Sequence, residues 1–294
     1  MASLNFFRQG SGKPLLLVHG LGSNGRSWSP VLDRLAADRE LIVVDLPGFG
    51  KSPPLEGRNT IPALADALSE FLSAEQLMGV DAAGHSMGGR LVLELARRGG
   101  LLGGVVALSP GGFWQGWERH YTYSTLWLSI RVLRRIQRAL PTLSAHAIGR
   151  TLLFAQLSAR PWKISPEVAL NELKSCSASP VFDELLWELV YGEAQQGAAL
   201  GSIPHPLVIA WGRQDRLTLP RQARRARSMF PDAHLHWFNA CGHYPQFDQP
   251  IEAAHLILAG TKGLATPRRI EPEGAKGQPE TLPMQVPGFS PAAA

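Results

Sequence analysis

The chain has 294 residues, of which 45% are hydrophobic, 8% are aromatic and 18% are charged, and its formal net charge at pH 7 is +5. This length suffices for one large core with an insertion, and without a run of about 20 apolar residues we expect no transmembrane segment. The positive charge is not accompanied by the interleaved aromatic and basic residues of a nucleic-acid module, so no nucleic-acid partner is expected.

The number of cysteines and the first ten residues indicate the cellular compartment. Cys176 and Cys241 are too few for a disulfide framework, which fits a reducing compartment. The first ten residues lack a basic region followed by a long apolar segment, as a secretory signal would have. Neither these cysteines nor the histidines have the spacing of metal ligands. We therefore expect a cytoplasmic protein without a bound metal.

Short apolar segments alternate with helical patterns over residues 1 to about 110. This alternation predicts a mainly parallel sheet. The predicted strands of this part are 14–18, 41–44, 80–83 and 105–110. Asp81 is an exception within the third of them, because such strands are usually apolar.

Two glycine-containing loops follow the first two of these strands. His19-Gly20-Leu21-Gly22 follows the first, and Asp45-Leu46-Pro47-Gly48-Phe49-Gly50-Lys51-Ser52 follows the second. Backbone N–H groups in a glycine-rich loop can stabilise a developing oxyanion, which makes the first loop a candidate for that role.

The segment Gly84-His85-Ser86-Met87-Gly88-Gly89 has the pattern of a serine on a sharp turn between a strand and a helix. Such a serine has strained backbone, and the glycines two residues to either side leave the space that the turn needs. Apolar residues then recur at helical spacing, at Leu91, Val92, Leu95 and Ala96. The pattern predicts that the Ser86 hydroxyl is presented above the sheet as a nucleophile.

Residues 111–203 change in character and predict helices without strands, over 114–140, 143–157, 166–174 and 180–191. Aromatic residues in this segment favour a largely apolar acyl site. Arg131, Arg134, Arg135 and Arg138 follow i, i+3, i+4, i+7 spacing, so they are expected on one helical face. That face is either solvated or a docking stripe for an anionic partner, such as a phospholipid surface, an acidic carrier protein or a phosphate-bearing acyl thioester.

Strand patterns resume at 206–212 and at 235–238, and each is followed by a titratable residue in a loop. These residues are Asp215 and His243. Because ligands bind beyond the carboxyl ends of strands in open α/β sheets, Ser86, Asp215 and His243 are expected to converge there. A serine needs a base, and the base an orienting acid, so the three form a candidate triad in the order Ser, Asp, His. Asp248 is expected at the surface.

Two further segments complete the sequence predictions, one between these two strands and one after them. Arg221, Arg224 and Arg225 are expected on a surface helix. The sheet pattern ends near Gly260, and residues 265–294, rich in Pro, Gly and Ala, are expected to be disordered.

Five features together make the chain resemble the α/β-hydrolase family over residues 4 to 260. They are His19-Gly20, the turn from Asp45 to Ser52, the Ser86 turn, the segment from Gly212 to Asp215, and Gly242-His243. The resemblance implies an α/β core of residues 1–110 and 204–264, with 111–203 inserted as a helical cap. It also implies that the N–H groups of Leu21 and Met87 form an oxyanion hole and that His19 and Asp45 are structural. Ser86 argues against the epoxide hydrolase and haloalkane dehalogenase branches, which have aspartate there.

The resulting expectation is a serine hydrolase that cleaves carboxylic esters with an apolar acyl group through an acyl-enzyme, without a cofactor. Several alternatives on the same triad stay open: carbon–carbon hydrolases of ring-cleavage products, thioesterases, hydrolases of acyl-carrier esters and cofactor-free perhydrolases. From another class, a binding or scaffold protein without turnover is a further alternative.

Overall fold

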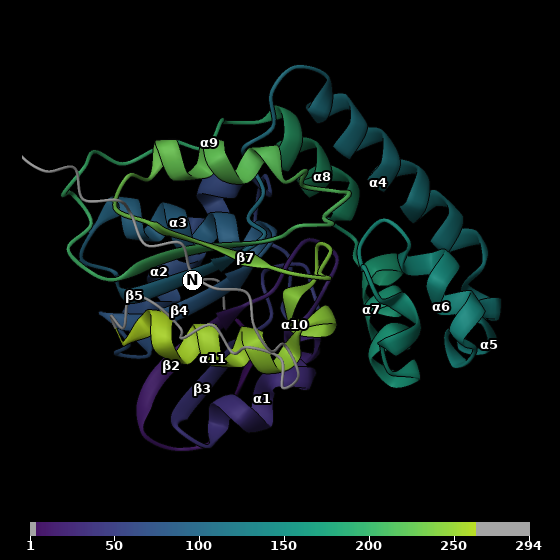
Figure 1. Ribbon diagram of the computed structural model, residues 1–294, viewed down its shortest axis with the longest axis horizontal. Helices are drawn as coiled ribbons and strands as arrows, with labels where there is room; N and C mark the ends of the chain where they lie inside the picture. Colours follow the sequence, from purple (N-terminus) through teal and green to yellow (C-terminus); the bar gives the residue numbers. More distant parts are fainter. Residues whose placement is uncertain (1–3, 263–294) are drawn as a thin grey trace, which may run out of the picture.

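The structure, a computed structural model, describes residues 4–262, so the tail predicted to be disordered, 265–294, lies outside the described residues. Within residues 4–262, seven strands form one sheet in the order β1-β3-β2-β4-β5-β6-β7 (Figure 1). Their bounds are β1 (Phe6–Gln9), β2 (Lys13–Val18), β3 (Arg39–Val44), β4 (Val80–His85), β5 (Leu102–Leu108), β6 (Leu207–Gly212) and β7 (His234–Phe238).

The predicted strands and the mainly parallel sheet are confirmed. Strands β2 to β7 pair in parallel, whereas β1 pairs antiparallel with β3 at the edge. The sequence did not predict β1, because its four residues Phe-Phe-Arg-Gln lie on a partly exposed edge and give neither an apolar run nor a clear alternation.

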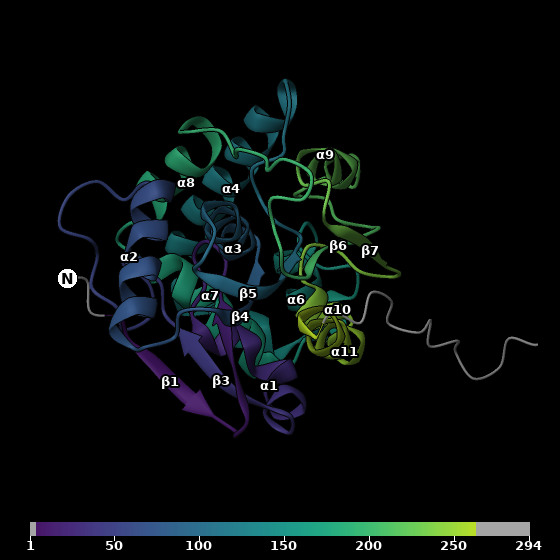
Figure 2. The same cartoon turned by 90° about the vertical axis from the view of Figure 1, so that its left-hand side faces the viewer.

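Helices cover both faces of the sheet (Figure 2). One face packs against α2 (Ile61–Ala74), α3 (Met87–Arg98) and α9 (Arg221–Met229), and the other against α1 (Ser29–Ala36) and α11 (Pro250–Thr261). In β2, Leu16 points to the first face and Leu17 to the second, and both are fully buried. Burial on both faces explains why these strands have continuous apolar sequences.

Asp81 lies inside β4, where its carboxylate is buried but paired. It accepts hydrogen bonds from Arg39 Nη2 at 2.6 Å and from the Gly104 N–H at 2.8 Å, and Lys13 Nζ lies 2.9 Å away. Arg39 is itself buried and also donates to Thr261 Oγ1. A buried charge is tolerated when it is paired in this way, which reconciles the aspartate with a buried strand.

Every residue from 111 to 203 is described, and this segment, here called the insertion, contains helices and no strand. The helices are α4 (Trp117–Arg135), α5 (Leu140–Ala145), α6 (Ala147–Phe154), α7 (Pro166–Ala178) and α8 (Phe182–Tyr191). Helices α4 to α7 lie together to one side of the sheet (Figure 1).

The predicted single helix over 114–140 is wrong. Helix α4 ends at Arg135, and a 3-10 turn (Gln137–Ala139) separates it from α5, which begins just before Pro141. Proline is compatible with the first turn of a helix but not with its interior. Arg138 therefore does not continue the arginine stripe of α4.

Candidate active site

Ser86 lies between the end of β4 and the start of α3, with φ 53° and ψ −114°. This left-handed φ is costly for a residue other than glycine and is held by the surrounding structure. A Cβ at Gly84 would lie 2.3 Å from the Gly88 carbonyl oxygen, and one at Gly88 would lie 2.3 Å from the Val18 carbonyl oxygen. Both glycines of the predicted turn are thus required by close backbone packing.

The structure brings the three predicted triad residues into hydrogen-bond contact. His243 Nε2 lies 2.9 Å from Ser86 Oγ, and His243 Nδ1 lies 2.9 Å from Asp215 Oδ2. Because a carboxylate only accepts, Nδ1–H donates to Asp215 and Nε2 is left to accept from the Ser86 hydroxyl. Asp215 and His243 are both 2% exposed. This arrangement can transfer a proton from Oγ to the imidazole.

The loop after β6 fixes the Asp215 carboxylate. Oδ1 accepts from the N–H groups of Leu217 at 2.8 Å and Thr218 at 2.9 Å, and Oδ2 accepts from Thr218 Oγ1 at 2.6 Å. Thr218 was not among the site residues predicted from the sequence. Its signal is the threonine three residues after an aspartate, a spacing at which backbone N–H groups bond back to the carboxylate.

The loop after β2 packs against the Ser86 turn. A Cβ at Gly20 would lie 3.1 Å from Ser86 Cβ, so the backbone approaches Ser86 closely here. The backbone N–H groups of Leu21 and Met87 donate no hydrogen bond to any other of the described residues. Met87 begins α3, and the first N–H groups of a helix have no partner in the helix. Both donors are therefore available to an oxygen atom of a ligand.

Two buried histidines hold the surrounding loops. His19 Nε2 accepts from the Leu46 N–H at 2.9 Å, so its Nδ1–H donates to the Gly20 carbonyl oxygen at 2.8 Å. His85 Nε2–H donates to the His243 carbonyl oxygen at 2.8 Å. Burial lowers the pKa of both side chains, and that of His85 lies well below its ordinary value. Neutral imidazoles fit these structural contacts.

The expectation that Asp248 lies at the surface is wrong. It is buried in α10 (Pro245–Asp248), and its carboxylate accepts from Ser158 Oγ, from the Ala159 N–H at 2.8 Å and from the Gly242 N–H at 2.7 Å. These donors belong to the insertion and to the His243 loop. Asp248 thus joins the two segments.

Helix α9 carries Arg221 at the surface as expected, but two of its arginines also contact the insertion. Arg221 and Arg225 both form ion pairs with Glu118, whose side chain is buried at the start of α4. Arg224 is exposed, as expected. Helix α9 is therefore linked to the insertion by charge pairing.

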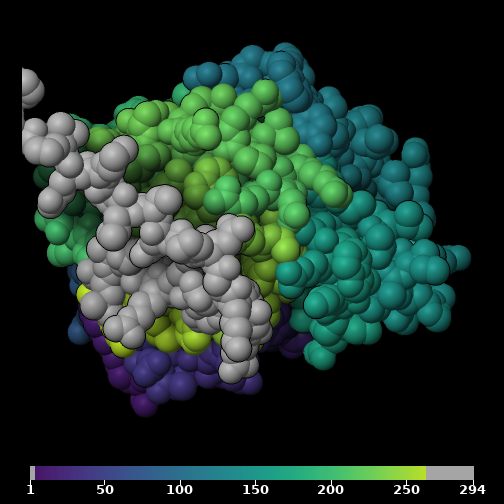
Figure 3. All heavy atoms as spheres, viewed as in Figure 1, coloured from purple at the N-terminus to yellow at the C-terminus, as the bar shows by residue number. Residues whose placement is uncertain are grey.

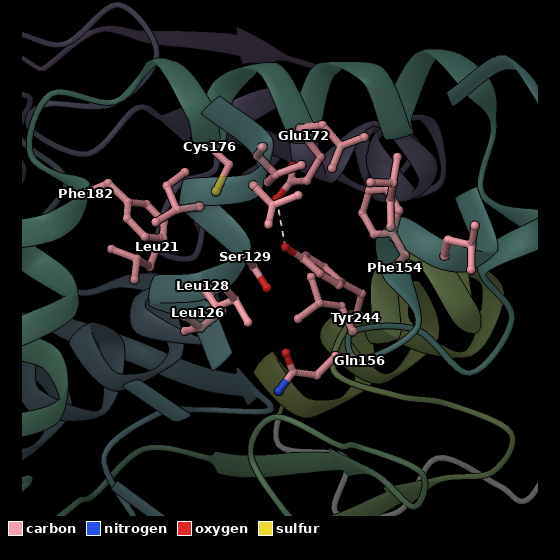
Figure 4. A pocket seen from close by; sticks show the side chains of 17 residues that line it. Leu21, Leu126, Leu128, Ser129, Phe154, Gln156, Glu172, Cys176, Phe182 and Tyr244 are labelled. Atoms are coloured by element: carbon pink, nitrogen blue, oxygen red, sulfur yellow. Dashed lines mark hydrogen bonds between the residues drawn. The ribbon is translucent and has the colours of Figure 1, made fainter. Parts of the chain in front are cut away.

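Ser86 opens into a small cavity of about 70 Å³ that adjoins a larger one of about 290 Å³ between α4, α6 and α7. Figure 4 shows the larger cavity, with Leu128 and Ser129 on one side and Phe154 on the other. Six residues line both cavities: Leu21, Leu126, Leu157, Cys176, Phe182 and Tyr244. The path away from Ser86 is thus mainly apolar.

One carboxyl group interrupts the apolar wall of the larger cavity. Glu172 Oε1 accepts from the Tyr244 hydroxyl at 2.9 Å (Figure 4). Its other oxygen, Oε2, accepts from Ser23 Oγ at 2.9 Å. Burial raises the pKa of Glu172 to about 7, with the two hydrogen bonds opposing the shift. This group was not predictable from the sequence, because its hydrogen-bond partners are 72 and 149 residues away in the chain.

Glu172→Gln is expected to change how stability depends on pH. Between the ordinary pKa of about 4.5 and the folded value of about 7, the folded state binds more protons than the unfolded state. The wild type should therefore lose stability relative to the variant as pH rises through this window, by about 1–3 kcal/mol. Urea unfolding across this window would measure the difference, and parallel pH profiles of the two proteins would contradict it.

The sequence profile described as "Alpha/beta hydrolase family" matches residues 15–255. The chain belongs to the alpha/beta hydrolase family. This alpha/beta hydrolase is 26% identical over 264 residues to the 2-hydroxymuconate semialdehyde hydrolase of Pseudomonas sp. (strain CF600), covering 86% of this chain and 88% of that protein.

Solved structures share the fold of this alpha/beta hydrolase. A thermophilic esterase from Thermogutta terrifontis matches with a TM-score of 0.69 and 22% identity, over 90% of this chain and 94% of that chain. A meta-cleavage product hydrolase from Pseudomonas fluorescens IP01 matches with a TM-score of 0.67 and 19% identity, over 89% and 94%. The chain is thus a hydrolase by family, and the proteins it resembles are named as an esterase and as hydrolases of other substrates.

Two further observations concern residues 4–262 of this alpha/beta hydrolase. No helix there combines the length and apolar character needed to cross a bilayer. The same residues contain no group of three or more His, Cys, Asp or Glu side chains placed to hold a metal ion.

Proposed function

We propose that this hydrolase cleaves carboxylic esters with Ser86 as nucleophile, His243 as general base and Asp215 as the residue that orients His243. The observation that carries the proposal is the continuous hydrogen-bond chain from Asp215 through His243 to Ser86, on a strained turn. The strain keeps Oγ at the carboxyl end of the sheet and free of the helix that follows.

The proposed reaction has two halves. His243 Nε2 takes the Ser86 proton as Oγ attacks the ester carbonyl, and the N–H groups of Leu21 and Met87 stabilise the oxyanion. His243 then gives this proton to the leaving alkoxide, which departs as an alcohol and leaves an acyl-enzyme. Water then loses a proton to His243 and attacks the acyl carbon, and His243 returns the proton to Ser86 as the acid leaves.

The lining of the cavities supports an apolar acyl group. Among the described residues that line the small cavity at Ser86, none is lysine or arginine. Beyond it, the larger cavity is lined mainly by leucine, isoleucine, valine and phenylalanine side chains. A chain of methylene groups would therefore be desolvated there mainly against apolar side chains, with Glu172 as the one carboxyl group in the lining.

A second candidate function is hydrolysis of a carbon–carbon bond in a ring-cleavage product. It is favoured by the relative named 2-hydroxymuconate semialdehyde hydrolase. By its name that substrate carries a carboxylate, and the Ser86 cavity offers no cationic lysine or arginine among its described lining residues to pair with it. The lining of the Ser86 cavity therefore favours an ester substrate over a carboxylate-bearing ring-cleavage product.

A direct comparison of substrates tests the proposal. Wild-type protein is assayed on p-nitrophenyl esters of increasing acyl length and on a 2-hydroxy-6-oxo-dienoate, each beside Ser86→Ala. A higher kcat/KM for a medium or long ester, lost in the variant, supports the ester hydrolase. A higher kcat/KM for the dienoate would establish the carbon–carbon hydrolase instead, and no turnover of either would contradict both.

Leu126→Trp is expected to shift the acyl-length preference towards short esters. Leu126 lies on α4 and lines both cavities, so a larger side chain narrows the passage between them. We expect kcat/KM for long-chain esters to fall by roughly 10-fold or more, with short-chain esters nearly unaffected, since each excluded CH₂ forfeits about 0.8 kcal/mol of burial. Ser124→Trp, at an exposed α4 position that lines neither cavity, is the matched control. An equal loss for short and long esters would contradict the predicted path.

A further inference from the structure

The central part of the insertion has an unusual charge balance. Between Glu118 and Glu167 the sequence contains no aspartate or glutamate. The basic residues over the same stretch are Arg119, Arg131, Arg134, Arg135, Arg138, Arg150, Arg160 and Lys163. A segment of one sign attracts anionic surfaces and disfavours contact with other basic ones.

Helix α4 presents apolar and cationic residues on one exposed face. Trp127, Leu128, Arg131, Val132 and Arg135 are all exposed, at the spacing of one helical stripe. The Arg131 guanidinium lies 4.9 Å from the centre of the Trp127 ring. Arg134, by contrast, is paired with Asp183 at 2.5 Å and is partly buried. The four arginines predicted on one helical face are therefore not equivalent. Only Arg131 and Arg135 are exposed and lie on α4.

Helix α6 adds two exposed aliphatic residues one turn apart. Ile148 is 77% exposed and Leu152 is 74% exposed. Leu152 lines the larger cavity together with Leu128 and Val132 of α4, which are also exposed. The larger cavity therefore reaches the surface between α4 and α6, where its rim is apolar. In Figure 3 the teal part of the insertion, which contains α4 to α7, forms one side of the molecule.

We propose that this docking face, made of Trp127, Leu128, Arg131, Val132, Arg135, Ile148 and Leu152, binds the surface of an anionic phospholipid membrane. The apolar side chains enter the interface between headgroups and acyl chains, and the arginines pair with lipid phosphates. An arginine can extend along an apolar surface and keep its charge in the headgroup layer.

Other occupants fit these observations less well. A second copy of the chain would place the arginines of one face against those of the other. An acidic carrier protein would satisfy the arginines but would not explain aliphatic side chains as exposed as Ile148 and Leu152. A lipid surface accounts for both features and for their position around the cavity.

The consequence for catalysis rests on the proposed function. An acyl chain leaving the membrane would enter the larger cavity past Leu128 and Leu152 and extend through the small cavity to Ser86. Membrane binding itself needs no turnover. The two proposals can therefore fail separately.

Co-sedimentation with vesicles tests the docking face without depending on ester hydrolysis. The full chain is mixed with vesicles of ether-linked phosphatidylcholine, with or without ether-linked phosphatidylglycerol. These lipids lack the acyl ester that the proposed reaction cleaves. We expect binding to the anionic vesicles, weaker binding at high salt and little binding to the neutral ones.

Paired variants locate the binding surface. Arg131→Gln with Arg135→Gln should weaken partitioning by about fivefold for each arginine. Leu128→Ser with Leu152→Ser should weaken it by about tenfold or more, since two exposed apolar contacts are lost. Two controls change other surfaces: Arg224→Gln with Arg227→Gln on α9 removes the same charge, and Ile251→Ser on α11 removes one exposed apolar side chain. These controls should bind as the wild type does.

Three results would overturn the proposal. The first is no binding to anionic vesicles by folded wild-type protein. The second is that the arginine substitutions on α9 weaken vesicle binding as much as the arginine substitutions on α4 do. The third is a dimer in analytical ultracentrifugation that Leu128→Ser with Leu152→Ser dissociates, which would assign the face to a second copy.

Discussion

Replacing Ser86 by alanine is expected to lower kcat for ester hydrolysis by about 10⁴- to 10⁶-fold. The variant loses the atom that attacks the carbonyl and forms the acyl-enzyme. It keeps the cavities and the N–H groups of Leu21 and Met87, so KM should change little. The size of the effect follows from the 2.9 Å contact between Ser86 Oγ and His243 Nε2, which alanine removes.

Initial rates on a p-nitrophenyl ester, with circular dichroism to verify folding, would measure this loss. Ser124→Ala is the matched control, because Ser124 is exposed on α4 and lines neither cavity. The control should keep near wild-type activity. If Ser86→Ala retained activity within about tenfold of the wild type, the assignment of the nucleophile would be wrong.

Asp215→Asn is expected to lower kcat by about 10⁴-fold. The carboxylate accepts Nδ1–H of His243 at 2.9 Å and so leaves Nε2 free to take the Ser86 proton. An amide can donate to Nδ1 instead, which favours the tautomer that carries its proton on Nε2 and cannot act as base. The variant also loses the negative charge that stabilises the imidazolium formed during attack.

A second variant separates the effect of the lost carboxylate charge from a disturbance of the loop that carries it. Thr218→Val removes the 2.6 Å hydrogen bond to Asp215 Oδ2 but leaves the carboxylate in place. We expect Thr218→Val to cost less activity than Asp215→Asn. Equal losses in the two variants would indicate that the loop, and not the carboxylate charge, is what His243 requires.

Features that depend on neighbouring residues were predictable from the sequence. The Ser86 turn needs glycines at fixed offsets, and the apolar strands that end before Asp215 and His243 determine where those residues lie in the sheet. The strand order of a parallel sheet then brings their loops to one edge.

Features that depend on contacts between distant segments were not predictable in this way. Glu172 meets Tyr244, 72 residues further on, and Asp248 meets Ser158, 90 residues earlier. In the sequence, Glu172 and Asp248 are isolated charged residues, and such residues are usually expected at the surface. The break after Arg135 likewise depends on where the chain turns back to form α5.

Covalent labelling of the wild-type protein with a fluorophosphonate tests the central claim most directly. The probe reacts with a serine that an adjacent base has activated, and intact-mass and peptide mass spectrometry identify the residue. The proposed triad predicts one adduct per chain, on Ser86, which is absent from Ser86→Ala and formed far more slowly in Asp215→Asn. An adduct on another residue, or none on the folded protein, would contradict the claim that Ser86 is an activated nucleophile.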